Sequence, residues 1–424
     1  MIAKSVANTS NDVDFAWIER VFKDKDYSLS DKMFPLNVAN EARSFHKTLP
    51  GYSTTPLVSL KKLAERLNVK DIWVKDESKR LELGSFKVVG GSFAVYRLIQ
   101  RKLGMEGKQL TFDYLSSSEC KKKLGNITFA SATDGNHGRG LAWIANKLGY
   151  KCVIYVHSLT SQPRIDAIAK YGATVKVIKG NYDNAVRQCG IDAEKNGWEV
   201  VSDTSWEGYT EIPTWIMQGY NTIFLEANEQ MKQYGADAPT HIFVQAGVGA
   251  LAASTIGFYS SLYKNKSPKF IVVEPSEAAC IYESALVNDD KPHTVEGDLD
   301  TIMAGLACGE PSPIAWNLLS NVADGFVKVP DFVAARGMRI LRAPLDGDKE
   351  VISGESGSVG LGALYSIMAQ NAKSAKDFRK TYGLDKNSRI LFINTEGNTD
   401  PVNYQNVVWE GYKSTPDKFI TSLC

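Results

Sequence analysis

Four short segments of this chain combine glycine, lysine and small polar residues at spacings that could support chemistry. The first is Gln245-Ala-Gly-Val-Gly-Ala-Leu251, which follows a strand-like run and precedes a helical pattern. Gly247 and Gly249 allow a tight turn in which backbone N–H groups point at an anion, with the positive end of a helix dipole behind them. The loop therefore predicts a phosphate site, although glycines also serve simply to let a strand and a helix pack closely.

The same loop fits a dinucleotide-binding fingerprint, because Gly247-x-Gly249-x-x-Ala252 matches the required spacing. Glu274 ends the next strand-like run, where an acidic residue would bind a ribose. An NAD-dependent oxidoreductase is thus one alternative, and a non-catalytic binding protein of the same fold is another.

The second segment, Gly84-Ser85-Phe86-Lys87, opens a helical pattern over 85–102. Most lysines are solvated surface charges, but Lys87 is followed by the apolar stretch VVGGSFAVY. Burial and the positive end of a helix dipole favour a neutral amine, as a Schiff-base lysine requires. A lysine of this kind together with a phosphate loop predicts pyridoxal 5′-phosphate rather than NAD.

The third and fourth segments are the loops ATDGNHG (132–138) and NTEG (394–397), which both follow strand-like runs. Thr133 or Asp134 could cap the following helix, or the loop could bind a substrate carboxylate. All four segments lie at strand ends or helix starts, where open α/β sheets bind ligands.

The elements that must position these segments alternate regularly between strand and helix. Strand-like runs occur at 127–131, 152–157, 174–178 and 198–202, and again at 241–245, 269–274, 325–329 and 389–394. We expect an α/β fold with two open, mainly parallel twisted sheets flanked by helices, and a ligand in the cleft between them. The first 50 or so residues read as a polar arm and a helix. The predicted domains are a large one (1–90 and 206–424) and a small α/β one (91–205).

Composition narrows the function classes. The 424 residues carry 49 Lys and Arg against 48 Asp and Glu, so there is no excess positive charge for nucleic acid. No apolar run reaches the length of a membrane span, and the first residues lack a secretory signal. Six scattered cysteines do not suggest a disulfide scaffold. We expect a soluble, cytoplasmic enzyme without a metal site.

Several long motifs, in order along the chain, extend the similarity far beyond one glycine loop. From about residue 38 to 411, the chain resembles the tryptophan-synthase β (fold-type II) family of pyridoxal-phosphate enzymes. Within that family it resembles the ammonia-lyases that act on 2,3-diaminopropionate. The motifs that carry the resemblance are KDES-x-R-x-x-x-GSFK (75–87), ATDGNHGRG (132–140), DTSWEGYTEIPTWIMQGY (203–220), QAGVGA (245–250), IMAGLACGEP (302–311), SGESGSVGLG (353–362) and NTEGNTD (394–400).

The resemblance implies a cofactor site at the domain cleft. Lys87 would form the Schiff base with Phe86 beside it, Asn136 would contact the 3′-oxygen, and Thr395 would face the pyridine nitrogen. The phosphate would be held by Gly247, Val248, Gly249 and Ala250. The substrate, a small amino acid, would meet Ser85, Thr133, Asp134 and Asp203. A homodimer is also implied.

Asp134 distinguishes this chain from the related dehydratases of hydroxy-amino acids, because those enzymes typically carry Ser-x-Gly-Asn-His in this loop. A carboxylate can pair with the β-ammonium of 2,3-diaminopropionate or accept the Cα proton. The implied reaction is an α,β-elimination that yields pyruvate and two ammonia, with Asp134 serving the L-isomer and Asp203 the D-isomer. The alternative that keeps the cofactor is a serine/threonine dehydratase.

The resemblance also places Cys280 and Cys308 near the entrance of the active site, either as a reversible disulfide or as two thiols. It assigns no role to residues 1–37.

Overall fold

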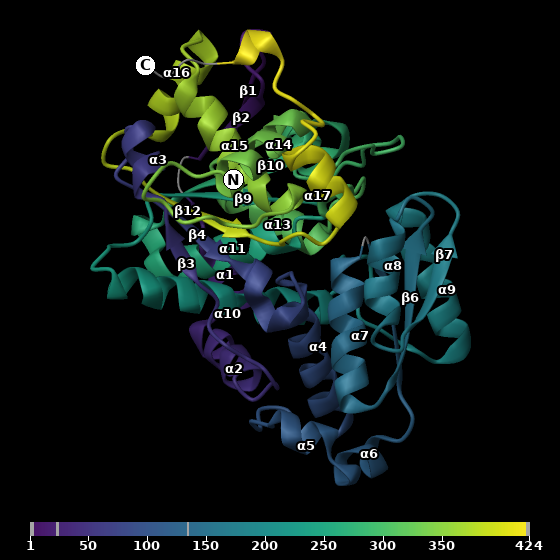
Figure 1. Ribbon diagram of the computed structural model, residues 1–424. Coiled ribbons are helices and arrows are strands. Elements are labelled where there is room, and N and C mark those ends of the chain that lie inside the picture. Colours follow the sequence, from purple (N-terminus) through teal and green to yellow (C-terminus); the bar gives the residue numbers. More distant parts are fainter. Residues whose placement is uncertain (1–3, 23–24, 134, 421–424) are drawn as a thin grey trace.

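The chain folds into two β-sheets whose faces are covered by helices (Figure 1). The computed structural model describes residues 4–22, 25–133 and 135–420. The strands are β1 (Lys4–Asn8), β2 (Ala16–Val21), β3 (Leu57–Ser59), β4 (Asp71–Asp76), β5 (Thr128–Thr133), β6 (Lys151–His157), β7 (Thr174–Ile178), β8 (Glu199–Val200), β9 (His241–Gln245), β10 (Lys269–Pro275), β11 (Gly325–Val329) and β12 (Arg389–Asn394).

The α-helices are distributed along the whole chain. They are α1 (Ser28–Met33), α2 (Leu36–His46), α3 (Lys61–Arg66), α4 (Lys87–Lys102), α5 (Phe112–Ser116), α6 (Ser118–Leu124), α7 (Asn136–Leu148), α8 (Gln162–Ala169), α9 (Tyr182–Asn196), α10 (Glu211–Gln233), α11 (Ala250–Tyr263), α12 (Cys280–Val287), α13 (Pro313–Val322), α14 (Asp331–Arg342), α15 (Glu355–Ala369), α16 (Lys373–Tyr382) and α17 (Pro401–Val408). Within the described ranges, none of them has both the length and the apolar character needed to cross a bilayer.

The larger sheet has eight strands in the order β1-β2-β11-β10-β9-β12-β4-β3. Its interior strands β11, β10, β9, β12 and β4 run parallel, as the sequence predicts, and their apolar residues are buried on both faces. The edge strands β1, β2 and β3 pair antiparallel. The prediction of a polar arm at the N-terminus is wrong here: β2 pairs with β11 because Trp17 and Ile18 are buried, and Trp17 packs 5.1 Å from the ring of Phe378.

The smaller sheet has four parallel strands in the order β7-β6-β5-β8. β8 is shorter than the predicted run over 198–202. After it, the Val201 N–H still donates to the Ala130 carbonyl at 2.8 Å, but the Ser202 N–H donates to the Tyr209 hydroxyl at 2.9 Å. The chain therefore leaves the sheet at Ser202, immediately before Asp203.

Helix α4 lies between the two sheets, packed against α10 on one side and α7 on the other (Figure 1). Glycines permit this close approach. A Cβ at Gly219 of α10 would lie 2.5 Å from the Val89 carbonyl oxygen, and one at Gly140 of α7 would lie 2.9 Å from the Val88 Cα. Lys87 is the first residue of α4, so this packing fixes the lysine at the cleft.

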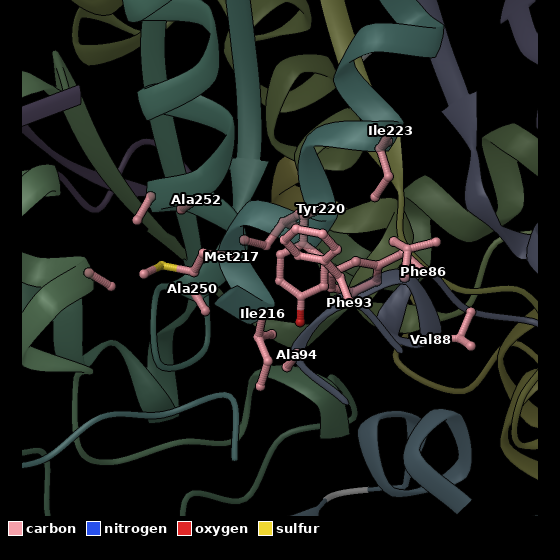
Figure 2. Packing of buried hydrophobic residues seen from close by; sticks show 14 of the residues in the cluster. Phe86, Val88, Phe93, Ala94, Ile216, Met217, Tyr220, Ile223, Ala250 and Ala252 are labelled. Atoms are coloured by element: carbon pink, nitrogen blue, oxygen red, sulfur yellow. The ribbon is translucent and has the colours of Figure 1, made fainter. Parts of the chain in front are cut away.

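The apolar core beneath Lys87 is dense and partly aromatic. Figure 2 shows Phe86, Phe93 and Tyr220 packed together, and the Phe86 and Tyr220 rings lie 4.7 Å apart. The strands of the smaller sheet all come from the segment 128–200. The domain boundaries at 90 and 206 stay a prediction, since α4 contacts helices on both sides.

Candidate active site

A cavity lies at the carboxyl ends of β9 and β12, and Asp203, which follows β8, is part of its wall. Nine residues selected from the sequence line it, and they come from five separate segments. These residues are Phe86, Lys87, Asn136, Asp203, Gly247, Val248, Gly249, Ala250 and Thr395. The wall also contains Tyr182, Gln245, Cys308, Ser356 and Glu396, for which the sequence suggested no cofactor or catalytic role.

The Lys87 ammonium and the Asp203 carboxylate form an ion pair across the cleft. Their side chains are only 15% and 7% exposed. The Tyr182 hydroxyl donates to the second carboxylate oxygen, Oδ1, at 3.3 Å. Burial alone would raise the pKa of Asp203, but the charges of Lys87 and His137 and these hydrogen bonds outweigh it and lower the pKa to about 2. Asp203 is therefore an anion at neutral pH.

The loop between β9 and α11 presents unpaired backbone donors. Within the described residues, the N–H groups of Gly247, Val248, Gly249 and Ala250 donate to no protein acceptor. They sit at the N-terminus of α11, where the helix dipole favours negative charge. The predicted anion site is thus present as a set of donors without protein partners.

Both glycines of this loop are required by the surrounding structure. Gly249 has φ of +94°, a left-handed conformation that favours glycine. A Cβ at Gly247 would lie 3.1 Å from the Cys308 Sγ and 3.2 Å from the Gly305 carbonyl oxygen. The loop therefore combines the geometry of a phosphate cradle with a tight fit against the segment 305–308.

At the other end of the cavity, the Thr395 hydroxyl is oriented by Gln245. The Gln245 Nε2 donates to the Thr395 Oγ1 at 3.0 Å and to the Ile393 carbonyl oxygen at 3.0 Å. Because this hydroxyl already accepts a hydrogen bond, its own proton is left to donate. A donor at this position suits an unprotonated ring nitrogen. Gln245 precedes the glycine loop directly, and that position at a strand end was the available signal for it.

Two further polar groups face the cavity. The Asn136 Nδ2 donates to the Glu396 Oε2 at 2.5 Å. The Ser356 Oγ is buried and has no hydrogen-bond partner among the described residues. A buried hydroxyl without a partner on the wall of a polar cavity indicates that a polar ligand completes its hydrogen bonding. The donor loop, the Thr395 hydroxyl and this serine all fit pyridoxal phosphate.

Two of the predicted substrate residues, Ser85 and Thr133, have other surroundings. The Ser85 Oγ accepts from the Lys87 N–H at 3.4 Å. The Thr133 Oγ1 accepts from the N–H groups of Gly135 and Gly138 at 2.9 and 3.0 Å, which is the capping role that the sequence also allowed. Neither side chain lines the cavity, so their contact with substrate stays a prediction. Asp134 lies outside the described residues.

Glu274 is not at the cavity, contrary to what the dinucleotide alternative requires. Its carboxylate accepts from the N–H groups of Ile281 and Tyr282 at 2.8 and 2.7 Å, at the start of α12. Complete burial raises the pKa of Glu274 to about 8. The residue caps a helix inside the protein, so its carboxylate is not available to bind a ribose.

Cys280 and Cys308 both lie close to Gly247 of the phosphate loop. Both are buried thiols in the structure, and the Cys280 Sγ is 3.7 Å from the Gly247 carbonyl oxygen. Burial raises the pKa of the Cys280 thiol. The reversible disulfide between them stays a prediction.

The tight packing around Gly247 predicts how a substitution there affects cofactor binding. Gly247→Ala places a methyl group against the backbone at Gly305, so we expect it to weaken pyridoxal phosphate binding at least about tenfold. Fluorescence titration of the apoenzyme measures this. Gly190→Ala is the matched control, because its new Cβ meets no described atom within 4 Å. Wild-type affinity in the Gly247→Ala variant would contradict the assignment of the loop.

Comparison with known proteins agrees with this geometry. A family model described as pyridoxal-phosphate dependent enzyme matches residues 48–396. A diaminopropionate ammonia-lyase of Salmonella typhimurium is 45% identical over 376 residues, which is 88% of this chain and 93% of that protein. An L-threonine dehydratase of Haemophilus influenzae is 26% identical over 330 residues, which is 76% of this chain and 54% of that protein.

Comparison with solved structures gives the same relationship as comparison of sequences. The crystal structure of diaminopropionate ammonia lyase from Escherichia coli in complex with D-serine superposes with a TM-score of 0.85 at 41% identity, covering 98% of this chain and all of that one. The chain therefore belongs to the fold-type II family of pyridoxal-phosphate-dependent enzymes and, within it, to the diaminopropionate ammonia-lyases.

Proposed function

We propose that this enzyme eliminates ammonia from 2,3-diaminopropionate and yields pyruvate and a second ammonia. The observation that carries the proposal is the buried pair of Lys87 and Asp203, which faces the phosphate loop in a family of known ammonia-lyases. It provides one amine for the cofactor and one carboxylate for proton transfer.

The residues that would hold pyridoxal phosphate divide by the part of the cofactor they meet. The loop 247–250 would bind the phosphate, Thr395 the ring nitrogen and Asn136 the ring oxygen, with Phe86 beside Lys87. When bound, the cofactor withdraws electrons from the substrate and so makes its Cα proton acidic. The protein's part is to orient the amino acid, exclude water and move protons.

Asp203 would act as a base toward the D-isomer, and Asp134 toward the L-isomer. A carboxylate with a pKa near 2 is a weak base, and the Lys87 charge is the main reason for that low value. Any event that removes this positive charge leaves burial as the dominant effect. The pKa of Asp203 then rises and the carboxylate becomes a stronger base.

The acidic character of the cavity wall favours an amine-bearing substrate over serine. Asp203 and Glu396 both line the cavity, and carboxylates attract the β-ammonium group of 2,3-diaminopropionate. The hydroxyl of serine gains no such attraction, and its departure requires a proton donor instead. The dehydratase alternative is therefore the weaker one.

We also propose a homodimer located in the cytoplasm. The resemblance to fold-type II enzymes supports the homodimer, and the sparse cysteines support the location.

The substrate proposal predicts a clear preference. Purified holoenzyme should release pyruvate and two equivalents of ammonia from 2,3-diaminopropionate, with kcat/KM at least about 100-fold above that for serine, because only the former carries a second ammonium group. A coupled lactate dehydrogenase assay follows the pyruvate. A preference for serine or threonine would contradict the proposal.

The division of labour between the two acids predicts opposite effects on the two isomers. Asp203→Asn should lower D-isomer turnover about 100-fold or more, since the general base is lost, and spare much of the L-isomer turnover. Asp134→Asn should do the reverse, and both variants should retain the cofactor's visible band. Equal losses on both isomers in each variant would contradict this division.

A further inference from the structure

Glu396 is a buried acid in the cavity to which neither the cofactor nor the proton-transfer proposal gives a role. It directly follows Thr395 at the carboxyl end of β12, and only 1% of the residue is exposed. Its backbone is held on both sides, because the Gly354 N–H donates to the Glu396 carbonyl at 3.0 Å and residues 85 and 396 form a bridge. The backbone at Glu396 is therefore fixed in place.

The Glu396 carboxylate receives donors from three separate segments. Asn136 Nδ2 donates at 2.5 Å from the start of α7, and Thr399 Oγ1 donates to the same oxygen at 3.2 Å. The Ser356 N–H, at the start of α15, donates to the other oxygen at 3.2 Å. Three donors on one carboxylate are what an anion needs when it is removed from water.

This arrangement determines which end of the Asn136 amide faces the acid. An ionised carboxylate can only accept hydrogen bonds, so the amide must present its Nδ2 and turn its carbonyl oxygen away. The NH₂ group has two hydrogens, of which one is used by Glu396. The second remains available to an acceptor in the cavity, which Asn136 also lines.

The neighbouring backbone leaves space for the Glu396 side chain. A Cβ at Gly354 would lie 3.0 Å from the Glu396 Cγ and 3.1 Å from its Oε1, so glycine is needed there. Burial, and then the nearby carboxylate of Glu396, raise the pKa of Glu355, the neighbouring buried acid.

We propose that Glu396 is a positioning residue, whose carboxylate locks the Asn136 amide with an N–H directed at the ring oxygen of the cofactor. An anionic ring oxygen is an acceptor, and a freely rotating amide could equally present its own oxygen to it and repel it. The proposal rests on the cofactor proposed for the cavity and is independent of the substrate. Loss of the acid should change cofactor affinity and colour without any reaction taking place.

The test is a double-mutant cycle on the holoenzyme with two readouts, the dissociation constant of pyridoxal phosphate and the pH midpoint of its visible absorbance. Glu396→Gln has nearly the same shape but can donate as well as accept. We expect it to weaken binding about tenfold and to shift the midpoint by about half a pH unit or more. In an Asn136→Ala background, Glu396→Gln should add less than about a twofold effect, because the group it positions is gone.

Thr399→Val is the matched control, since it removes another donor to the same carboxylate but leaves Asn136 in place. It should change affinity less than about twofold. If circular dichroism shows that Glu396→Gln does not fold, Glu396→Asp replaces it in the same double-mutant cycle. The shorter side chain keeps the charge but moves the acceptor oxygens away from Asn136.

Equal effects of the Glu396 substitution with and without Asn136 would overturn the proposal, and so would wild-type affinity and colour in the Glu396 variant. Both readouts are taken without substrate, so a failure of the 2,3-diaminopropionate assay leaves this result unaffected, and the reverse also holds.

Discussion

A largely enclosed ion pair joins Lys87 and Asp203 at the cleft between the two sheets. Lys87 begins the helix that packs against α10, whereas Asp203 follows the last strand of the smaller sheet. Removing one partner would leave the other charge in this site without compensation, which destabilises the protein. The glycines at 140 and 219, which let α4 approach both of its neighbours, are part of the same constraint. Helix α4 must pack closely against α7 and α10 for Lys87 to contact Asp203.

Around this pair, three parts of the cavity wall differ in their chemistry. Backbone N–H groups at the start of α11 suit an anion, and a hydroxyl oriented by Gln245 suits a neutral nitrogen. A carboxylate with three donors orients an amide toward the third end. Because these groups differ in charge and hydrogen-bonding character, they select both a ligand and its orientation. The whole set depends on strand ends that converge from one parallel sheet, supplemented by α7 of the other.

Sequence reasoning located the strands and the glycine loop well, because alternating strands and helices and tight strand–helix turns leave local patterns. It missed the strands β1, β2 and β3 at the edges of the larger sheet. The residues of β1 are largely exposed, and such an edge strand has little apolar patterning to detect. It offered Glu274 as a ribose ligand because an acid at a strand end has the same sequence signature whether it meets a ligand or caps a helix. Tyr182 and Gln245 were missed because their partners, Asp203 and Thr395, lie 21 and 150 residues away.

The identity of the cofactor-bound lysine tests the account most directly. Borohydride reduction of the holoenzyme, followed by peptide mapping, records which lysine carries the cofactor. The structure contains another lysine in a closed environment, Lys75, which is fully buried and forms an ion pair with Glu226 at 2.7 Å. We predict that the label is found on Lys87 alone and that the visible band disappears on reduction. A label on Lys75 or on any other lysine would contradict the central assignment.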